Sequence, residues 1–285
     1  MTGIYISTII LASILGILLY GVNVKLAKNR IISFILTIGT LYLIKPYICA
    51  RAQLVTFILF ILTIYFIERF LETKKIKYAI GLVVIPILIA NLHVATFYFY
   101  FILYLPYIAE FVLYIFAYAN VIISGAKVDS IRKKIQKQGE TEELLEKLQK
   151  AEEKHKRLKE KEDNRIEKPY KIKMTYHDSI KILIIIMLIC LLTGFLTPLG
   201  TTPYTYLIKT MQGISTKNIN EHLPTVLAEN KNLLITFAVY IAIVAFTKIK
   251  VKLSDIFLLG GLGLLAILSR RQASMFYLIR SNSIK

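Results

Sequence analysis

Long apolar runs are the feature that most restricts what this chain of 285 residues can fold into. Residues 31–44 and 54–67 form two such runs. Several windows reach about 20 predominantly apolar residues, the length with which a helix crosses a bilayer. The hydrophobic share of the sequence is 56%, with a mean hydropathy of +0.60, whereas a soluble domain is about 45–50% apolar. The sequence therefore predicts an integral membrane protein.

We predict an all-α, polytopic fold with about eight transmembrane helices. The apolar runs place these helices at residues 3–22, 31–49, 52–68, 78–92, 95–120, 180–197, 232–248 and 255–270. Pro86 and Pro106 are the expected kinks. The N-terminus lacks the basic start and the small-residue cleavage site of a signal peptide, so we interpret it as the first span.

A charged segment divides the apolar sequence into two parts. Residues 1–124 contain the first five predicted helices, and residues 179–285 contain the last three, with a long loop at 198–231. Residues 125–178 between them are predicted to form a cytoplasmic helical hairpin. The four-three spacing of a coiled-coil seam is followed by Leu144, Leu148, Ala151, His155 and Leu158. Two interpretations stay open: a solvated spacer, and a dock at 128–168 for a cytosolic partner or anionic lipid.

The net charge of +18 does not indicate nucleic-acid binding, because most basic residues outside the charged segment flank the apolar runs. Such cations set the orientation of membrane proteins. The basic loops 23–30, 68–77, 125–181 and 248–252 fall on one side of the predicted bundle, which should therefore be cytoplasmic. We expect the lipid bilayer as a partner, and no nucleic acid.

Four polar clusters fall on the opposite, outer side of the predicted bundle. They are Arg51-Ala52-Gln53, Asn91-Leu92-His93, Asn220-Glu221-His222 and Ser269-Arg270-Arg271-Gln272. Groups that are costly in lipid are usually kept for function, so these clusters predict a site. The planar fork of arginine suits phosphate. Structural interpretations also stay open: Arg51 as a snorkelling residue, His93 as a hydrogen-bonded turn residue, and Glu221 as a rim residue.

Other ionisable groups give weaker signals. Glu110 lies within a predicted span and should pair with an Arg, a Lys or a Tyr hydroxyl, and Glu68-Arg69 should anchor the end of the third span. Cys49 and Cys190 form neither a disulfide framework nor a CxxC metal motif. No metal-ligating residues are predicted, and a divalent cation stays open as a cofactor.

The order of these short motifs resembles that of a bacterial family of multi-pass proteins akin to GT-C-type glycosyltransferases, which use polyprenyl-phosphate sugars. Over residues 45–280, the matching stretches are Arg51-Ala52-Gln53, Glu68-Arg69, Ala90-Asn91-Leu92-His93, Thr197-Pro198-Leu199-Gly200, Ile219-Asn220-Glu221-His222-Leu223-Pro224 and Ser269-Arg270-Arg271-Gln272. The family usually carries a catalytic carboxylate in its first outer loop, whereas loops 22–30 and 44–51 here contain no acid. The chain also ends soon after Arg271, so the resemblance implies a truncated or divergent member.

The resemblance implies a protein of the bacterial plasma membrane that binds a polyprenyl-phosphate-linked sugar at its outer face and transfers the sugar. Glu221 is then the candidate base, and His93 is the second candidate catalytic residue. The residues expected to bind the substrate are Arg51, Gln53, Asn91, His222, Arg270 and Arg271. The alternative is a non-enzymatic transporter component or scaffold whose hairpin docks a partner. The sugar donor, the acceptor and the oligomeric state stay undetermined at this level.

Overall fold

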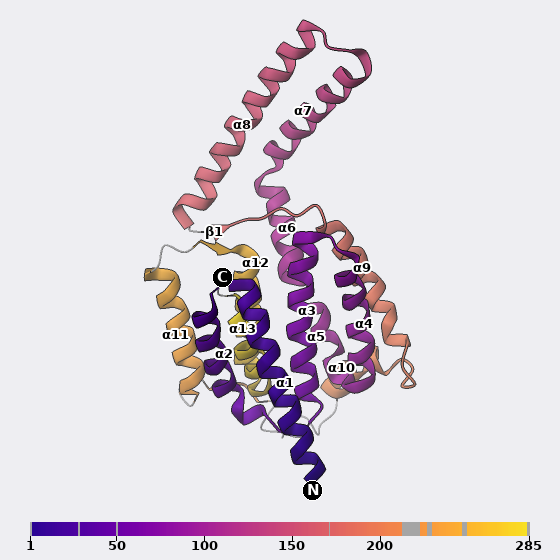
Figure 1. The fold of residues 1–285 in the computed structure, drawn as a ribbon, viewed down its shortest axis with the longest axis vertical. Helices are drawn as coiled ribbons and strands as arrows, with labels where there is room; N and C mark the ends of the chain where they lie inside the picture. Colours follow the sequence, from indigo (N-terminus) through magenta and orange to yellow (C-terminus); the bar gives the residue numbers. More distant parts are fainter. Residues whose placement is uncertain are drawn as a thin grey trace.

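The computed structural model describes residues 2–27, 29–49, 51–170, 172–212, 223–226, 230–246 and 250–283. The described chain is almost entirely helical, as predicted. Most helices run alongside one another in a bundle, and two long helices project from one end of it as a hairpin (Figure 1). We call this the hairpin end, and the other the opposite end.

The bundle is built from helices of both halves of the sequence. The first half contributes α1 (Thr2–Ala27), α2 (Arg30–Ile44), α3 (Gln53–Thr73), α4 (Ile76–Leu92), α5 (Phe97–Ile102) and α6 (Leu105–Ala117). The second half contributes α9 (Ile180–Leu192), α10 (Thr202–Gln212), α11 (Lys231–Phe246), α12 (Leu253–Leu268) and α13 (Ala273–Ser283). Among the described residues, short 3-10 turns lie between helices: η1 (Lys45–Tyr47), η2 (Val94–Thr96), η3 (Thr193–Phe195) and η6 (Arg270–Gln272).

Helix α3 forms the centre of the bundle. It contacts α1, α4, α9 and α13, and 72% of its most apolar window is buried, against 11% for that of α1. The largest fully buried side chains are Phe57 and Phe60 of α3 together with Phe97, Tyr100 and Tyr104. With about 1.5 Å of rise per residue, the 21 residues of α3 extend about 30 Å. One helix therefore reaches from the opposite end of the bundle to the hairpin end.

Apolar helices occur near all eight predicted positions, but the prediction of about eight full-length spans is too high. In the described residues, three helical stretches are long and apolar enough to cross a membrane: Thr2–Leu26, Gln53–Thr73 and Val94–Ala117. The shorter apolar helices are Ile76–Leu92, Ile180–Phe195, Lys231–Ala242, Leu253–Leu268 and, with 15 residues, α2.

The shortening of α2 has a local cause. The chain tightens into η1 at Lys45, with Pro46 in the first turn. Proline has no N–H to donate, so the α-helical hydrogen-bond pattern cannot continue through Pro46. The predicted helix 31–49 therefore stops at Ile44. At its other end, the Asn29 side chain accepts hydrogen bonds from the N–H groups of Ile31 and Ile32, which caps the first turn.

The projecting hairpin consists of α7 (Ala119–Gln138) and α8 (Glu142–Tyr170). Between the helices, Gly139 adopts a positive φ of 87°, a conformation that glycine allows without steric cost. His155 Nδ1 lies 2.9 Å from Ser124 Oγ, and Arg132 pairs with Glu152 at 2.7 Å. The residues of the predicted seam, Leu144, Leu148, Ala151, His155 and Leu158, are all half-buried.

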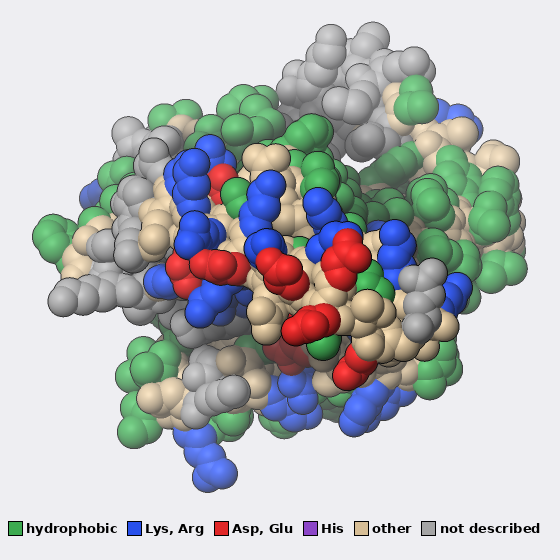
Figure 2. All heavy atoms as spheres, turned by 90° about the horizontal axis from the view of Figure 1, so that it is seen from above, with side chains coloured by type: hydrophobic (Ala, Val, Ile, Leu, Met, Phe, Trp, Pro, Cys, Tyr) green, Lys and Arg blue, Asp and Glu red, His purple; other side chains and the backbone are tan. Residues whose placement is uncertain are grey.

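Charged side chains are concentrated on this hairpin. Viewed onto the hairpin end, Figure 2 shows acidic and basic side chains over the projecting helices and hydrophobic side chains on the bundle around them. The chain returns from α8 through β1 (Ile172–Lys173), which pairs in parallel with β2 (Val251–Lys252), so that Ile172 lies opposite Val251. The strand pair joins the base of the hairpin to the start of α12.

Candidate functional site

Three of the four predicted polar clusters lie together at the opposite end of the bundle. Two of them, at Arg51–Gln53 and at η6, line an open recess with a volume of about 380 Å³, which we call the arginine recess. Its lining consists of Pro46, Tyr47, Cys49, Arg51, Gln53, Arg270 and Arg271. Side chains from η1, the loop before α3 and η6 therefore meet although they are far apart in the sequence.

Hydrogen bonds hold the two halves of the recess together. Tyr47 Oη donates to the carbonyl of Arg270 at 3.2 Å. Gln53 Nε2 donates to Ser274 Oγ at 3.3 Å, and this hydroxyl donates to the carbonyl of Arg271 at 2.8 Å. Gln53 is buried, so its pairing with Ser274 avoids the cost of leaving the amide unsatisfied. These bonds fix η6 against the start of α3.

His93, from the second cluster, lies behind the arginines. Its Nε2 is 3.4 Å from Arg271 Nη2, and its Nδ1 is 2.7 Å from Thr56 Oγ1. A guanidinium only donates, so Nε2 must accept, and Nδ1 then carries the proton and donates to Thr56. Thr56 Oγ1 in turn donates to the carbonyl of Ala52 at 3.2 Å. The chain of bonds assigns a neutral imidazole to His93.

The surroundings of His93 favour this neutral form. Burial lowers the pKa of His93 below its usual 6.5, and the positive charge of Arg271 lowers it further. Both ring nitrogens are occupied by partners within the protein. A general base needs a free lone pair directed at its substrate. In this geometry His93 contacts Arg271 and Thr56, and its catalytic role stays a prediction.

Of the remaining predicted residues, the structure describes Asn91, which lies at a different helix junction. Asn91 is exposed, and its Nδ2 donates to the carbonyls of Ile87 at 2.8 Å and Leu196 at 3.0 Å. It joins the end of α4 to the segment after η3 and is not among the described side chains that line the arginine recess. Glu221 and His222, the candidate base and a predicted binding residue, lie outside the described residues together with Asn220.

The described residues just after His222 run along the start of η6. The N–H of Arg270 donates to the carbonyl of Leu223 at 3.1 Å. Thr225 donates from its N–H to the carbonyl of Ile267 at 2.8 Å, and from Oγ1 to that of Ala266 at 2.7 Å. Residues 223–225 are therefore held beside Arg270 and the end of α12.

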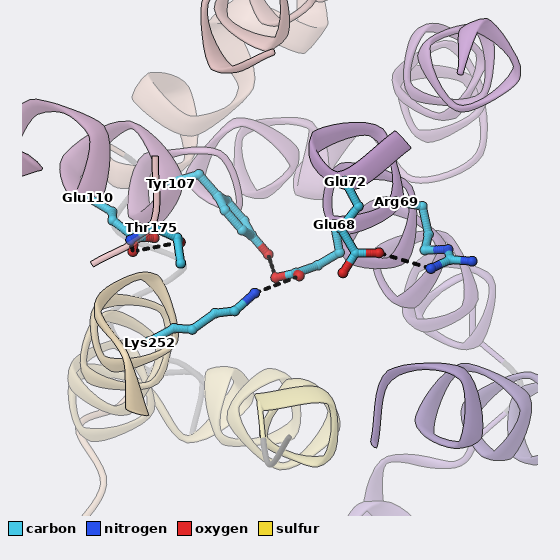
Figure 3. Close-up of polar contacts among 7 residues, drawn as sticks. All are labelled: Glu68, Arg69, Glu72, Tyr107, Glu110, Thr175 and Lys252. Atoms are coloured by element: carbon cyan, nitrogen blue, oxygen red, sulfur yellow. Dashed lines mark hydrogen bonds and ion pairs between the residues drawn. The ribbon is translucent and has the colours of Figure 1, made fainter. Parts of the chain in front are cut away.

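A second polar cluster lies at the hairpin end (Figure 3). Tyr107 Oη donates to Glu68 Oε1 at 3.0 Å, and Lys252 Nζ lies 3.6 Å from Glu68 Oε2. Glu110 Oε1 accepts from both the N–H and Oγ1 of Thr175, at 2.9 and 3.1 Å. Glu68 and Glu110 are each only 4% exposed. The cluster encloses a cavity of about 20 Å³, enough for about one water molecule.

This cluster corrects two expectations about acidic residues. Glu68 is not an anchor at the surface but a buried acceptor for Tyr107 and Lys252. Glu110 is paired as expected, but with Thr175 and not with an Arg, a Lys or a Tyr. Thr175 follows the hairpin, and no sequence signal links it to Glu110. The hydrogen bonds fasten the returning chain to α6, so we assign this cluster a structural role.

The described residues contain no group of three or more His, Cys, Asp or Glu side chains that could hold a metal ion. Cys49, which lines the arginine recess, and the buried Cys190 are both free thiols. The arginine recess brings three guanidinium groups together beside the amide of Gln53 and the phenol of Tyr47. Comparisons with protein-family models, curated proteins and solved structures gave no match for this chain.

Proposed function

We propose that this chain is an integral membrane protein whose arginine recess binds the phosphate group of a lipid-linked substrate. The observation that carries this proposal is the meeting of Arg51, Arg270 and Arg271 in one recess at the end of an apolar bundle.

The exterior of the bundle supports a membrane location. Large hydrophobic side chains are widely exposed, among them Ile17 at 73%, Phe116 at 77% and Phe246 at 90%. Soluble monomers rarely expose contiguous apolar surface of more than a few hundred Å². A bilayer would cover this surface, and Thr2–Leu26, Gln53–Thr73 and Val94–Ala117 are long enough to cross it.

The composition of the recess supports phosphate as the bound group. Arginine forms paired, charge-assisted hydrogen bonds with phosphate oxygens. Arg271 is oriented by His93, and Gln53 is oriented by Ser274. A volume of about 380 Å³ lies within the usual range of sites for small ligands, roughly 300–1,000 Å³.

Within this function, we propose sugar transfer from a polyprenyl-phosphate donor as the reaction, in a multi-pass protein of the bacterial plasma membrane. The support is the order of the motifs in the sequence together with the recess that two of them line. Arg51, Arg270 and Arg271 would hold the phosphate, and Glu221 is the candidate base.

Binding of undecaprenyl phosphate to the purified chain in lipid nanodiscs tests the first part of the proposal. We expect Arg51→Ala and Arg270→Ala each to raise the dissociation constant at least tenfold, because each removes a charge-assisted contact worth about 1.5–3 kcal/mol. Arg132→Ala is the matched control, since Arg132 pairs with Glu152 on the hairpin. Unchanged binding in both recess variants would disprove phosphate binding at this site.

The transfer reaction needs a separate variant. Glu221→Gln removes the candidate base and leaves the three arginines in place. We expect this variant to bind undecaprenyl phosphate like the wild type and to lose sugar release from a polyprenyl-phosphate sugar. The assay is run with and without Mg²⁺, which decides the metal dependence. Transfer at the wild-type rate would remove Glu221 from the mechanism while leaving the binding proposal intact.

The projecting hairpin favours a second candidate function, a scaffold that docks a cytosolic partner. Its two helices are held together by Arg132–Glu152 and Ser124–His155 and extend beyond the bundle (Figure 1). This function predicts that replacing residues 128–168 with a short linker abolishes the cellular role. Variants of the arginine recess would then have little effect.

A further inference from the structure

A second basic recess lies at the hairpin end of the bundle. It is lined by cations and aromatic rings, unlike the polar cluster around Glu68 and Glu110. It has a volume of about 500 Å³ and is formed by the end of α1, the last turns of α3 and the first turn of α4. Its lining consists of Lys25, Tyr65, Phe66, Arg69, Lys77 and Tyr78. We call it the lysine recess.

The lysine recess has an aromatic floor. The rings of Tyr65, Phe66 and Tyr78 lie 5.9–6.2 Å apart, centroid to centroid. Phe66 fits there because α4 carries a glycine: a Cβ on Gly81 would lie 2.4 Å from the Phe66 ring. Three aromatic side chains therefore close the bottom of the recess where α3 meets α4.

Cations surround this floor. Lys25 Nζ lies 5.3 Å from the ring centroid of Tyr65, and Lys77 Nζ lies 5.1 Å from that of Tyr78. Arg69 is paired with Glu72 at 2.9 Å (Figure 3). Its guanidinium also donates a hydrogen bond to Tyr78, so the charged group is held at the edge of the aromatic floor. Three cations against one carboxylate leave the recess positively charged.

An exposed apolar stripe runs along α4 from the lysine recess. With 3.6 residues per turn, Lys77, Ile80, Val84 and Leu88 fall on one face of the helix. The three apolar side chains are 57%, 44% and 40% exposed. A cationic recess at the head of an exposed apolar stripe has the layout of a phospholipid, with the headgroup in the recess and an acyl chain along the helix.

We infer that the lysine recess binds the phosphate diester of an anionic phospholipid, in the leaflet opposite the arginine recess. Cations that only set the orientation of a membrane protein have to flank its spans, but they do not have to lie close to one another. Here cations from three helices converge on one aromatic floor. Basic pockets between membrane helices bind anionic headgroups in this way. The site is separate from the lipid-linked substrate proposed above, with which it shares only the membrane location.

Native mass spectrometry of the full chain in detergent tests this inference, with dioleoyl phosphatidylglycerol as the probe and dioleoyl phosphatidylcholine as the zwitterionic comparison. We expect the anionic lipid to bind at least tenfold more tightly. The double variant Lys25→Gln/Lys77→Gln should weaken its binding about 30-fold, the effect of two basic residues near an anionic surface. Lys25→Arg/Lys77→Arg should retain binding within about threefold, because the charge is kept.

The matched control is Lys127→Gln/Lys133→Gln, which removes the same charge from α7 and should leave lipid binding unchanged. Equal phosphatidylglycerol affinity in Lys25→Gln/Lys77→Gln and the wild type, with helix content preserved by circular dichroism, would overturn the inference. Displacement of the lipid by equimolar glycerol 3-phosphate would also overturn it, since the site would then serve a soluble phosphate. Arg51→Ala should leave phosphatidylglycerol binding intact, which separates this result from that of the arginine recess.

Discussion

At the scale of single residues, the chemistry of His93 is decided by two neighbours. Arg271 and Thr56 engage its two ring nitrogens, and burial keeps the ring neutral. Protonation would replace the accepting nitrogen by a donor and place two positive charges side by side. The orientation of Arg271 therefore depends on the protonation state of His93, which lies between α4 and η2.

This dependence predicts how stability changes with pH. The pKa of His93 is lowered in the folded chain, so the unfolded chain binds the proton more readily as the pH falls. The contribution of His93 to stability is complete above the unfolded pKa of about 6.5 and is lost as the pH falls through the lowered folded value. His93→Gln lacks this titration. We expect the difference in thermal midpoint between wild type and His93→Gln to shrink from pH 7.5 to pH 5, and an unchanged difference would contradict the assignment.

At the scale of elements, the α7–α8 hairpin is held by half-buried seam residues and a few polar contacts. Leu148 and Leu158 both lie in the predicted seam and are half-buried in the structure. Burial of a leucine contributes about 1.5–3 kcal/mol when complete. Leu148→Lys/Leu158→Lys should therefore separate the two helices without affecting the bundle.

Hydrogen exchange measured by mass spectrometry checks this prediction. Amides within 142–165 should exchange faster in Leu148→Lys/Leu158→Lys, while those of α3 keep their protection. Lys154→Ala is the control, because Lys154 lies on the exposed side of α8. Equal exchange in the hairpin of the wild type and the double variant would show that the seam does not hold it.

Apolar runs in the sequence locate the helices, but their ends and partners depend on contacts that the sequence does not reveal. The helix predicted at 31–49 stops at Ile44 because of Pro46, whose effect on a helix can be predicted from the sequence. By contrast, α13 was not predicted, although its residues 273–279 are buried against the bundle. Its sequence is short and contains Arg280 and Asn282, so it lacks the long apolar run of a membrane span.

The candidate site was predictable to a similar extent. Alternation of the spans brought Arg51 and Arg271 to one end, which agrees with their positions in one recess. Alternation of the spans does not predict that Asn91 contacts the segment after η3. The direction of its side chain is set by the last turn of α4. Nor does alternation identify Thr175 as the partner of Glu110, which is 65 residues away and across the hairpin.

At the scale of the whole molecule, the exposed apolar surface predicts how the protein partitions. Exposed side chains such as Ile17 and Phe246 would promote aggregation in water, and a bilayer would cover them. After alkaline carbonate washing of membranes that contain the expressed chain, we expect it in the pellet, where integral proteins remain. A co-expressed soluble protein serves as the control. Recovery of the chain in the supernatant would contradict membrane integration.

The bond between Gln53 and Ser274 has a consequence for biosynthesis. The recess is assembled from residues 221 positions apart, and a ribosome adds about 5–20 residues per second. About 10–45 s must therefore pass after Gln53 is translated before its partner exists. During that interval the amide of Gln53 lacks the hydroxyl with which it pairs in the folded chain. The two sides of the arginine recess can therefore meet only after Ser274 has been translated.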